Sequence, residues 1–315
     1  MLYNEHYKRY SKGYDRGKGE RQMTGTGQKN PSKRKQQVRR YWVMIGLALV
    51  LCIGILGYHF LGGNQEKEAV AITQTKQQKE LWEQAKQEAG LSLETPEEHL
   101  EQVRIQATVQ GYPKGVIELL DKNPATVDYV EAYGEKQGQI YAEDIGDDYV
   151  EGQIPLLIQW DERWGYAPYG TSVVAVSGCG PTCMAMVAAG LNHDPTITPA
   201  KVAAYGTENS YVDEENNTYW AFMQEAGADF GLSCYSGFLT EQQLAAELSA
   251  GHPVICSMGP GYFTQNGHFI VMTGYENGQI RINDPFSEEN SARTWSYAEI
   301  QDQIKAMWVY SLAGQ

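Results

Sequence analysis

The sequence predicts an α+β domain with a mainly antiparallel sheet, preceded by one transmembrane helix and a helical stalk. Three observations lead to this prediction. An apolar run of 21 residues lies near the N-terminus, the segment after it has the composition of solvated helices, and helix-like patterns precede strand-like patterns in the C-terminal half. The expected regions are a basic cytoplasmic tail (1–40), a transmembrane helix (41–61), a helical stalk or linker (62–150) and the α+β domain (151–315).

Charge is distributed unevenly along the 315 residues. The chain has 25 basic and 39 acidic side chains, which gives a formal net charge of −14. Residues 1–40 contain 12 Lys and Arg against 3 Asp and Glu, a net of +9, so the remainder carries 13 − 36 = −23. An apolar fraction of 42% is sufficient for a packed core and excludes a wholly disordered or collagen-like chain. The basic tail has no recognition motif, so no nucleic-acid partner is expected.

The uncharged run Tyr41–Leu61 predicts a helix that crosses a lipid bilayer. As an α-helix it would be about 31 Å long, and aromatic residues lie near both of its ends. A cleaved signal peptide is the alternative, because Ala69-Val-Ala has the small-x-small form, but the forty residues before the run exceed the usual signal-peptide lengths. The basic excess before the run predicts a cytoplasmic N-terminus and an extracytoplasmic C-terminal domain at the cell membrane.

Residues 62–150 are expected to form a stalk of short helices. The first part is rich in Lys, Glu, Gln and Ala, and Thr95 is predicted to cap the helix that follows it. Two further short helices are expected over Pro113–Asp121 and Val127–Tyr133. The acidic segment Ala142–Glu151 is untypical of a packed element, which places the domain boundary near residue 150.

Apolar patterns predict helices first and strands later in residues 151–315. Helices are expected over Pro181–Leu191 and over Thr240–Ala250, which ends before a glycine. Strand-like apolar runs are Ile154–Ile158, Val254–Ser257, Phe269–Tyr275 and Gln279–Asn283.

Cys179 is the cysteine whose surroundings predict a reactive thiol. It lies in Ser177-Gly-Cys-Gly-Pro-Thr-Cys, where two glycines permit a tight turn and Pro181 suits a first helical turn, so Cys179 is expected at a helix N-terminus. Such a position favours the thiolate and lowers a cysteine pKa to roughly 3.5–7.5 from about 8.5. The structural alternative is a small buried residue between packing glycines.

The other cysteines do not have the spacing of a zinc site, so neither a metal nor a cofactor is predicted. Cys52 lies in the expected span, and Cys183 lies one turn further into the helix, where burial would make it inert. A disulfide between Cys234 and Cys256 stays open.

His268 is the candidate proton acceptor among the six histidines. His6, His59 and His99 fall in the tail, at the membrane edge and in the stalk, whereas His193 and His252 lie in turn-like segments. His268 precedes the apolar run of a buried strand, which places it at the mouth of that strand.

A hairpin is expected to bring Asp284 to His268. Glu276-Asn-Gly indicates the turn, and a loop of three residues would pair Tyr275 with Gln279. In that register His268 and Asp284 lie on the same face of the hairpin, about 7–8 Å apart at the backbone. A two-residue loop would put them on opposite faces. Taken separately, a core histidine and a turn-forming aspartate are the structural alternatives.

Four segments occur in a fixed order: Ile154-Pro-Leu-Leu-Ile-Gln-Trp-Asp-Glu-Arg-Trp-Gly, Gly178-Cys-Gly-Pro-Thr, Gly267-His-Phe-Ile-Val and Asn283-Asp-Pro. In that order they resemble the C39-like cysteine peptidases, a branch of the papain-like fold. The resemblance covers about 151–312. It implies a papain-like cysteine peptidase in which Cys179 matches the nucleophile, His268 the general base, Asp284 the residue that orients the base, and Gln159 the oxyanion donor.

Two features depart from the bacteriocin-processing members that the sequence resembles. Gln159 precedes Cys179 by twenty residues, which is longer than in those members. They are also fused to an export transporter, whereas this sequence has one predicted span and no P-loop pattern, so leader cleavage coupled to export is not expected.

The expected function is therefore that of a membrane-anchored extracytoplasmic cysteine peptidase, which hydrolyses peptide bonds through a covalent acyl-enzyme. Its expected partners are a peptide or protein substrate and the lipid bilayer, through residues 41–61; no oligomeric state is predicted. Two alternatives stay open: a cell-wall peptide amidase or transpeptidase that uses the same triad, and a catalytically inactive scaffold that binds peptides.

Overall fold

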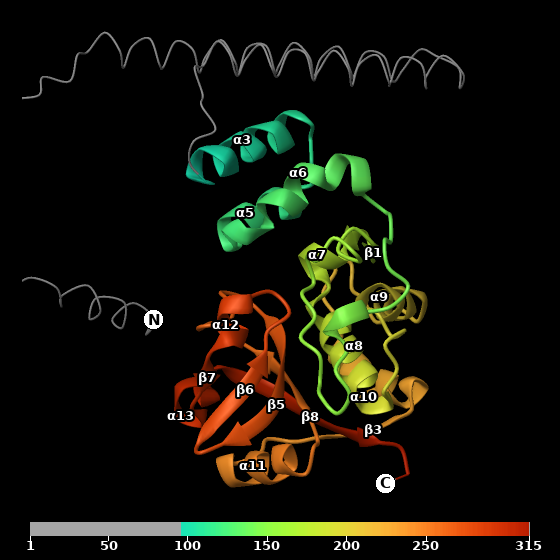
Figure 1. Ribbon diagram of the computed structural model, residues 1–315, viewed down its shortest axis with the longest axis vertical. Coiled ribbons are helices and arrows are strands. Elements are labelled where there is room, and N and C mark those ends of the chain that lie inside the picture. Colours follow the sequence, from blue (N-terminus) through green and yellow to red (C-terminus); the bar gives the residue numbers. More distant parts are fainter. Residues whose placement is uncertain (1–95, 315) are drawn as a thin grey trace, which may run out of the picture. The chain divides into compact units, whose positions relative to one another are not determined.

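The computed structural model describes residues 96–314 (Figure 1). The predicted span at 41–61 and the first part of the expected stalk, 62–95, lie outside the described residues. Within residues 96–314, no helix combines the length and the apolar character that crossing a bilayer requires.

A six-stranded sheet with the order β3-β8-β4-β5-β6-β7 forms the C-terminal part of the fold (Figure 1). Neighbouring strands are antiparallel throughout, so the predicted antiparallel sheet and the α+β class are confirmed. The strands are β3 (Leu232–Ser236), β4 (Val254–Met258), β5 (His268–Glu276), β6 (Gln279–Asn283), β7 (Thr294–Trp295) and β8 (Ile304–Leu312).

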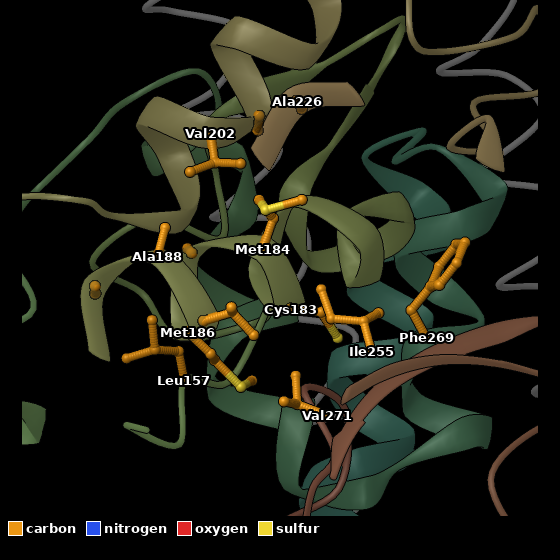
Figure 2. Close-up of a cluster of buried hydrophobic side chains, with 14 of the residues drawn as sticks. Leu157, Cys183, Met184, Met186, Ala188, Val202, Ala226, Ile255, Phe269 and Val271 are labelled. Carbon is orange, nitrogen blue, oxygen red and sulfur yellow. The ribbon is translucent and has the colours of Figure 1, made fainter. Parts of the chain in front are cut away.

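Helix α8 (Cys179–Asn192) packs against one face of this sheet. Its residues from Gly180 to Gly190 are all buried, which is the pattern of a helix enclosed on every side. Figure 2 shows the core that results, in which Met186 of α8 lies beside Val271 of β5, with Ile255 of β4 close by. Helix α9 (Pro199–Glu208) packs beside α8 in the same layer.

The opposite face of the sheet carries the alternate residues of the same strands. Val254 and Cys256 of β4 and Ile270 of β5 are buried there against α11 (Glu241–Ser249). Thr240 is the N-cap of α11 and forms a capping box with Gln243, and Ala250 is the C-cap, so the predicted helix over 240–250 is confirmed. The sheet is thus buried on both faces.

Within residues 96–150 the structure has four α-helices: α3 (Pro96–Val109), α4 (Lys114–Ile117), α5 (Leu119–Lys122) and α6 (Val127–Lys136). The predicted helix over 113–121 is therefore two short helices, which meet at Glu118. Packing continues across the boundary expected near residue 150, because Tyr129 of α6 stacks on Tyr166 with 4.3 Å between the ring centroids.

The apolar run Ile154–Ile158 is not a strand, which corrects the prediction. Its backbone forms no strand pairing; the carbonyls of Ile154 and Pro155 instead accept hydrogen bonds from the side chain of Asn283, through Nδ2. Leu157 is fully buried in the α8 core, which explains the apolar character of the run. The remaining elements of residues 96–314 are β1 (Pro168–Tyr169), β2 (Ser172–Val173), α7 (Val174–Ser177), α10 (Trp220–Glu225), α12 (Glu288–Ala292), α13 (Tyr297–Ile300) and short 3-10 helices at Pro124–Thr126, Gly146–Asp148, Ala226–Phe230 and Gln301–Gln303.

Candidate active site

Cys179 is the first residue of helix α8, as predicted. The short helix α7 ends two residues earlier, and the N–H of Gly178 donates to the carbonyl of Val174 at 2.7 Å. A Cβ atom at Gly178 would lie 2.5 Å from that carbonyl oxygen, and one at Gly180 would lie 2.6 Å from Oγ1 of Thr218. The two glycines are therefore required by close approach, and they place Cys179, a partly exposed residue, at the positive end of a 14-residue helix.

His268 and Asp284 are in direct contact. His268 Nε2 lies 2.7 Å from Asp284 Oδ1, and the side chains are 8% and 1% exposed, respectively. The carboxylate accepts two further hydrogen bonds, from the backbone N–H of Phe286 to Oδ1 and from Asn290 Nδ2 to Oδ2 at 2.8 Å. A buried carboxylate with this many donors is held in one orientation.

The hairpin reaches this contact by a route other than the predicted one. The loop has two residues, Asn277 and Gly278, both with positive φ, and Glu276 pairs with Gln279. The three-residue loop is therefore wrong. A bulge at Thr273 adds one residue to β5, so that Met272 pairs with Ile282.

The bulge has a consequence for the two polar side chains. Met272 opposite Ile282 is the register that a three-residue loop would have produced at this end of the hairpin. A two-residue loop alone would have put His268 and Asp284 on opposite faces, and the extra residue in β5 reverses that change. The predicted proximity of the two residues is confirmed by their hydrogen bond, although the expected turn is not.

The imidazole of His268 also forms a hydrogen bond with the thiol of Cys179. Because Nε2 is occupied by Asp284, Nδ1 is the ring nitrogen left for the sulfur. Burial raises the pKa of Cys179, but the hydrogen bond and the charge of His268, with the backbone N–H groups of Phe269 and Gly180, lower it below its ordinary value of 9.0. Burial likewise lowers the pKa of His268, but Asp284 and the thiolate raise it to about 10. The arrangement thus favours a thiolate beside an imidazolium.

Gln159 is buried between the Asp284 loop and the turn before Cys179. Its backbone N–H donates to the carbonyl of Pro285, and its Nε2 donates to the carbonyl of Ala175, both at 2.7 Å. An amide nitrogen carries two protons, so one N–H remains beyond the bond to Ala175. The role of this side chain as an oxyanion donor stays a prediction.

The remaining cysteines described by the structure are free thiols. Cys234 and Cys256 lie on β3 and β4, which are separated by β8, so two strand spacings alone put their backbones about 9–10 Å apart; their β8 partners, Tyr310 and Met307, are three residues apart, which increases the separation further. A disulfide requires a Cα separation of roughly 4.4–6.8 Å, which excludes the pairing that the sequence left open. Cys183 is fully buried, and burial raises its pKa well above the ordinary value, as expected for an inert thiol.

The other histidines in residues 96–314 are away from this cluster, as predicted. His193 ends α8 in the left-handed conformation, His252 contacts Glu247, and His99 contacts Glu131.

The sequence did not predict Asn290, which holds the second oxygen of Asp284. Asn290 lies in the first turn of α12, whose N-cap is Ser287, and Trp295 Nε1 donates to its carbonyl at 3.0 Å. The capping signal of Ser287 followed by two glutamates would have placed Asn290 in that first turn. It would not have shown which face of the turn meets the carboxylate.

Residues 151–313 match the model of the Peptidase C39-like family, which is more than half of the chain. The chain belongs to this family. Cys179, His268, Asp284 and Gln159 all lie within the matched residues, whereas α3 to α6 lie before them. Membership of the C39-like family indicates a function of the cysteine peptidase kind.

Two solved structures resemble this chain. One is the peptidase domain of Streptococcus ComA, a bifunctional ABC transporter involved in a quorum-sensing pathway, with 23% identity, a TM-score of 0.34, and coverage of 44% of this chain and 93% of that chain. The other is described as a C39-like peptidase from Bacillus anthracis, with 15% identity, a TM-score of 0.35, and coverage of 51% and 96%. None of the curated proteins matches this chain.

Proposed function

We propose that this C39-like chain is a membrane-anchored cysteine peptidase that hydrolyses peptide bonds through Cys179, His268 and Asp284. One observation carries the proposal: Nε2 of His268 lies 2.7 Å from Oδ1 of Asp284, which leaves Nδ1 of the same ring for the interaction with the thiol of Cys179. A nucleophile, a base and a group that orients the base are the three parts that covalent acyl transfer requires.

The first step is attack of the Cys179 thiolate on the carbonyl carbon of the substrate. A sulfur–carbon bond forms, and the electron pair of the carbonyl double bond moves to the oxygen. The free N–H of Gln159 and an unpaired N–H at the start of α8 are the donors for this oxyanion, each contributing on the order of 3 kcal/mol. These donors are fixed before the reaction, because Gln159 is held by Ala175 and Pro285.

Collapse of the tetrahedral intermediate breaks the carbon–nitrogen bond, and His268 gives its proton to the leaving amine. Water then attacks the thioester while His268 accepts a proton from that water. The sulfur–carbon bond breaks, the carboxylic acid product leaves, and the thiolate and imidazolium are restored. Asp284 holds the imidazole ring in one tautomer through both steps. Burial raises the pKa of Asp284, but His268, Asn290 and the N–H of Phe286 lower this pKa by more, so the carboxylate stays ionised.

Turnover of peptides by the full-length chain tests this function. We expect the wild-type chain to cleave members of a mixed peptide library, and we expect Cys179→Ser and His268→Ala to cleave none at a measurable rate. Tyr141→Ala is the matched control, because Tyr141 is 50% exposed and its contacts are with Gln139, Tyr166 and Lys136 rather than with the triad. Equal turnover by wild type and Cys179→Ser would overturn the proposal.

The same assay separates the two alternatives. Turnover of purified cell-wall peptides without turnover of the library assigns the triad to wall amide bonds. Equal peptide binding by wild type and Cys179→Ser, with no reaction of Cys179 with a cysteine-directed alkylating probe, assigns an inactive scaffold.

We also propose that residues 41–61 anchor the chain in the cell membrane with the N-terminus in the cytoplasm and the peptidase domain outside. The 21 uncharged residues of the run and the net charge of +9 before it support this orientation. A membrane-impermeant maleimide added to intact cells is expected to label Cys179 and to leave Cys179→Ser much less labelled. Labelling that appears only after the cells are lysed would contradict this orientation.

A further inference from the structure

Two exposed aromatic side chains begin helix α10. Tyr219 and Trp220 are 48% and 52% exposed, although both are large and apolar. Large exposed aromatic groups that lie together on a surface commonly mark a binding site. Their position relative to Cys179 is defined by two separate sets of contacts.

The first set runs along the backbone. Thr218 packs against Gly180, so closely that a Cβ atom there would lie within 2.6–2.9 Å of three atoms of the threonine side chain. Gly180 is next to Cys179, and two residues of chain span at most about 7 Å, so the backbone of Trp220 lies within about 7 Å of that of Thr218.

The second set runs through aromatic rings. Trp220 meets Trp308 of β8 edge to face, with 5.8 Å between centroids, and Trp308 lies 6.2 Å from Phe269. Phe269 follows His268, its N–H reaches the sulfur of Cys179, and Figure 2 shows its ring at the margin of the buried cluster. Trp308 and Phe269 are almost fully buried, so Trp220 is the accessible end of this series of rings.

We propose that Trp220 binds an aromatic or large aliphatic side chain of the substrate, two or three residues from the bond that is cleaved. The inference rests on the proposed peptidase function. An extended peptide rises about 3.4 Å per residue, so a side chain two or three positions from the scissile carbonyl lies about 7–10 Å along the peptide from the cleaved bond. Trp220 lies two residues after Thr218, which packs against the neighbour of Cys179, so it is on the chain segment that such a side chain would meet. Buried Trp308 supports the exposed ring from behind, so the ring surface is offered without a large loss of side-chain entropy.

The substrate is thereby assigned to peptides with an apolar side chain near the cleaved bond. An aromatic contact of this kind contributes about twofold to tenfold in rate or affinity. The experiment uses fluorescence-quenched peptides in pairs that differ only in Phe or Ala, placed in turn at each of three positions on either side of the cleaved bond.

We expect the full-length wild-type chain to prefer Phe at one position by a clear ratio of kcat/KM. Trp220→Ala should reduce this ratio by about twofold to tenfold, while Trp220→Phe and the exposed control Tyr141→Ala keep it. Reaction of Cys179 with iodoacetamide should be the same in Trp220→Ala and wild type, since that reagent is too small to use the subsite. A ratio that is equal in wild type and Trp220→Ala would overturn the inference.

Binding separates failure of the inference from failure of the proposed function. The affinity of the Phe and Ala peptides is measured for Cys179→Ser and for the double variant that also carries Trp220→Ala. Weaker Phe-peptide binding in the double variant supports the subsite even if wild type cleaves no peptide, in which case only the peptidase function is overturned. Binding of N-acetylglucosamine oligomers that depends on Trp220, with no dependence on the peptide side chain, would overturn the subsite.

Discussion

Asn290→Ala is expected to weaken the fold and the reaction through one hydrogen bond. Asn290 Nδ2 donates to Oδ2 of Asp284 at 2.8 Å, and the Asp284 side chain is 1% exposed. Removal of a hydrogen bond to a buried charge costs about 1.5–3 kcal/mol. For a folded body of this size that corresponds to a decrease in Tm of about 3–12 °C. If the whole cost appears in the alignment of the triad, kcat/KM decreases by up to about 100-fold.

The pH dependence identifies the mechanism of this loss. Asp284 has a lowered pKa in the folded state, so its contribution to stability is present above its unfolded pKa of about 3.9 and is lost as pH falls through the folded pKa. Without Asn290 the folded pKa lies closer to the unfolded one. The difference in Tm between wild type and Asn290→Ala should therefore be full at pH 7 and shrink toward pH 3.

Ser287→Ala is the matched control, because Ser287 accepts the backbone N–H of Asn290 and caps the same helix without contacting the carboxylate. Its cost of about 1 kcal/mol should be independent of pH. Thermal unfolding of the three full-length proteins at pH 7 and near pH 3 gives the comparison. A difference for Asn290→Ala that is equal at both pH values, or one that Ser287→Ala reproduces, would refute the proposed role of the hydrogen bond.

Three other perturbations have expected outcomes. Asn123 Nδ2 donates to the carbonyl of Phe286, two residues after Asp284. Asn123→Ala should therefore lower kcat/KM severalfold and lower the free energy of unfolding by about 1 kcal/mol. An unchanged kcat/KM would show that the N-terminal helices do not affect the site. Gly180→Ala should lower kcat/KM because the new methyl group displaces Thr218, and an unaltered rate would contradict the close approach. Asp284→Asn should remove the decrease in unfolding free energy between pH 7 and pH 3 that this carboxylate causes, which denaturant titration measures.

The local elements were predictable because each has a short-range signal. Helix α8 has Gly178 as its N-cap and Gly180 and Pro181 in its first turn, and α11 has a Thr240 cap with Gln243 at the third helical position. Strands β5 and β6 are apolar runs joined by Asn277-Gly278. These signals place Cys179 at a helix start and His268 at the start of a strand.

Long-range pairing was not predictable from the same patterns. Strand β8 lies between β3 and β4 in the sheet, yet nothing within Ile304–Leu312 specifies those neighbours. The apolar run Ile154–Ile158 shows the opposite error, in which a strand is predicted where none forms. The run is apolar because it is buried, and the side chain of Asn283 bonds backbone carbonyls that a neighbouring strand would otherwise have paired.

The bulge at Thr273 had no signal either, because threonine is common in regular strands. The Asn277-Gly278 pair is the usual two-residue turn, and that turn alone predicts the wrong face for Asp284. The correct proximity followed from a three-residue loop that the protein does not use. Resemblance of the four ordered segments, and not the turn, was therefore the stronger evidence that His268 and Asp284 meet.

The most direct test of the proposed chemistry is the pH profile of alkylation of Cys179 by iodoacetamide in the full-length chain. The wild-type rate should follow a thiol pKa below 9.0, because His268 stabilises the thiolate. In His268→Ala the pKa should rise, since burial then acts without the imidazolium, and Cys179→Ser should lack this reaction. Profiles that are identical with and without His268 would contradict the ion pair on which the peptidase mechanism depends.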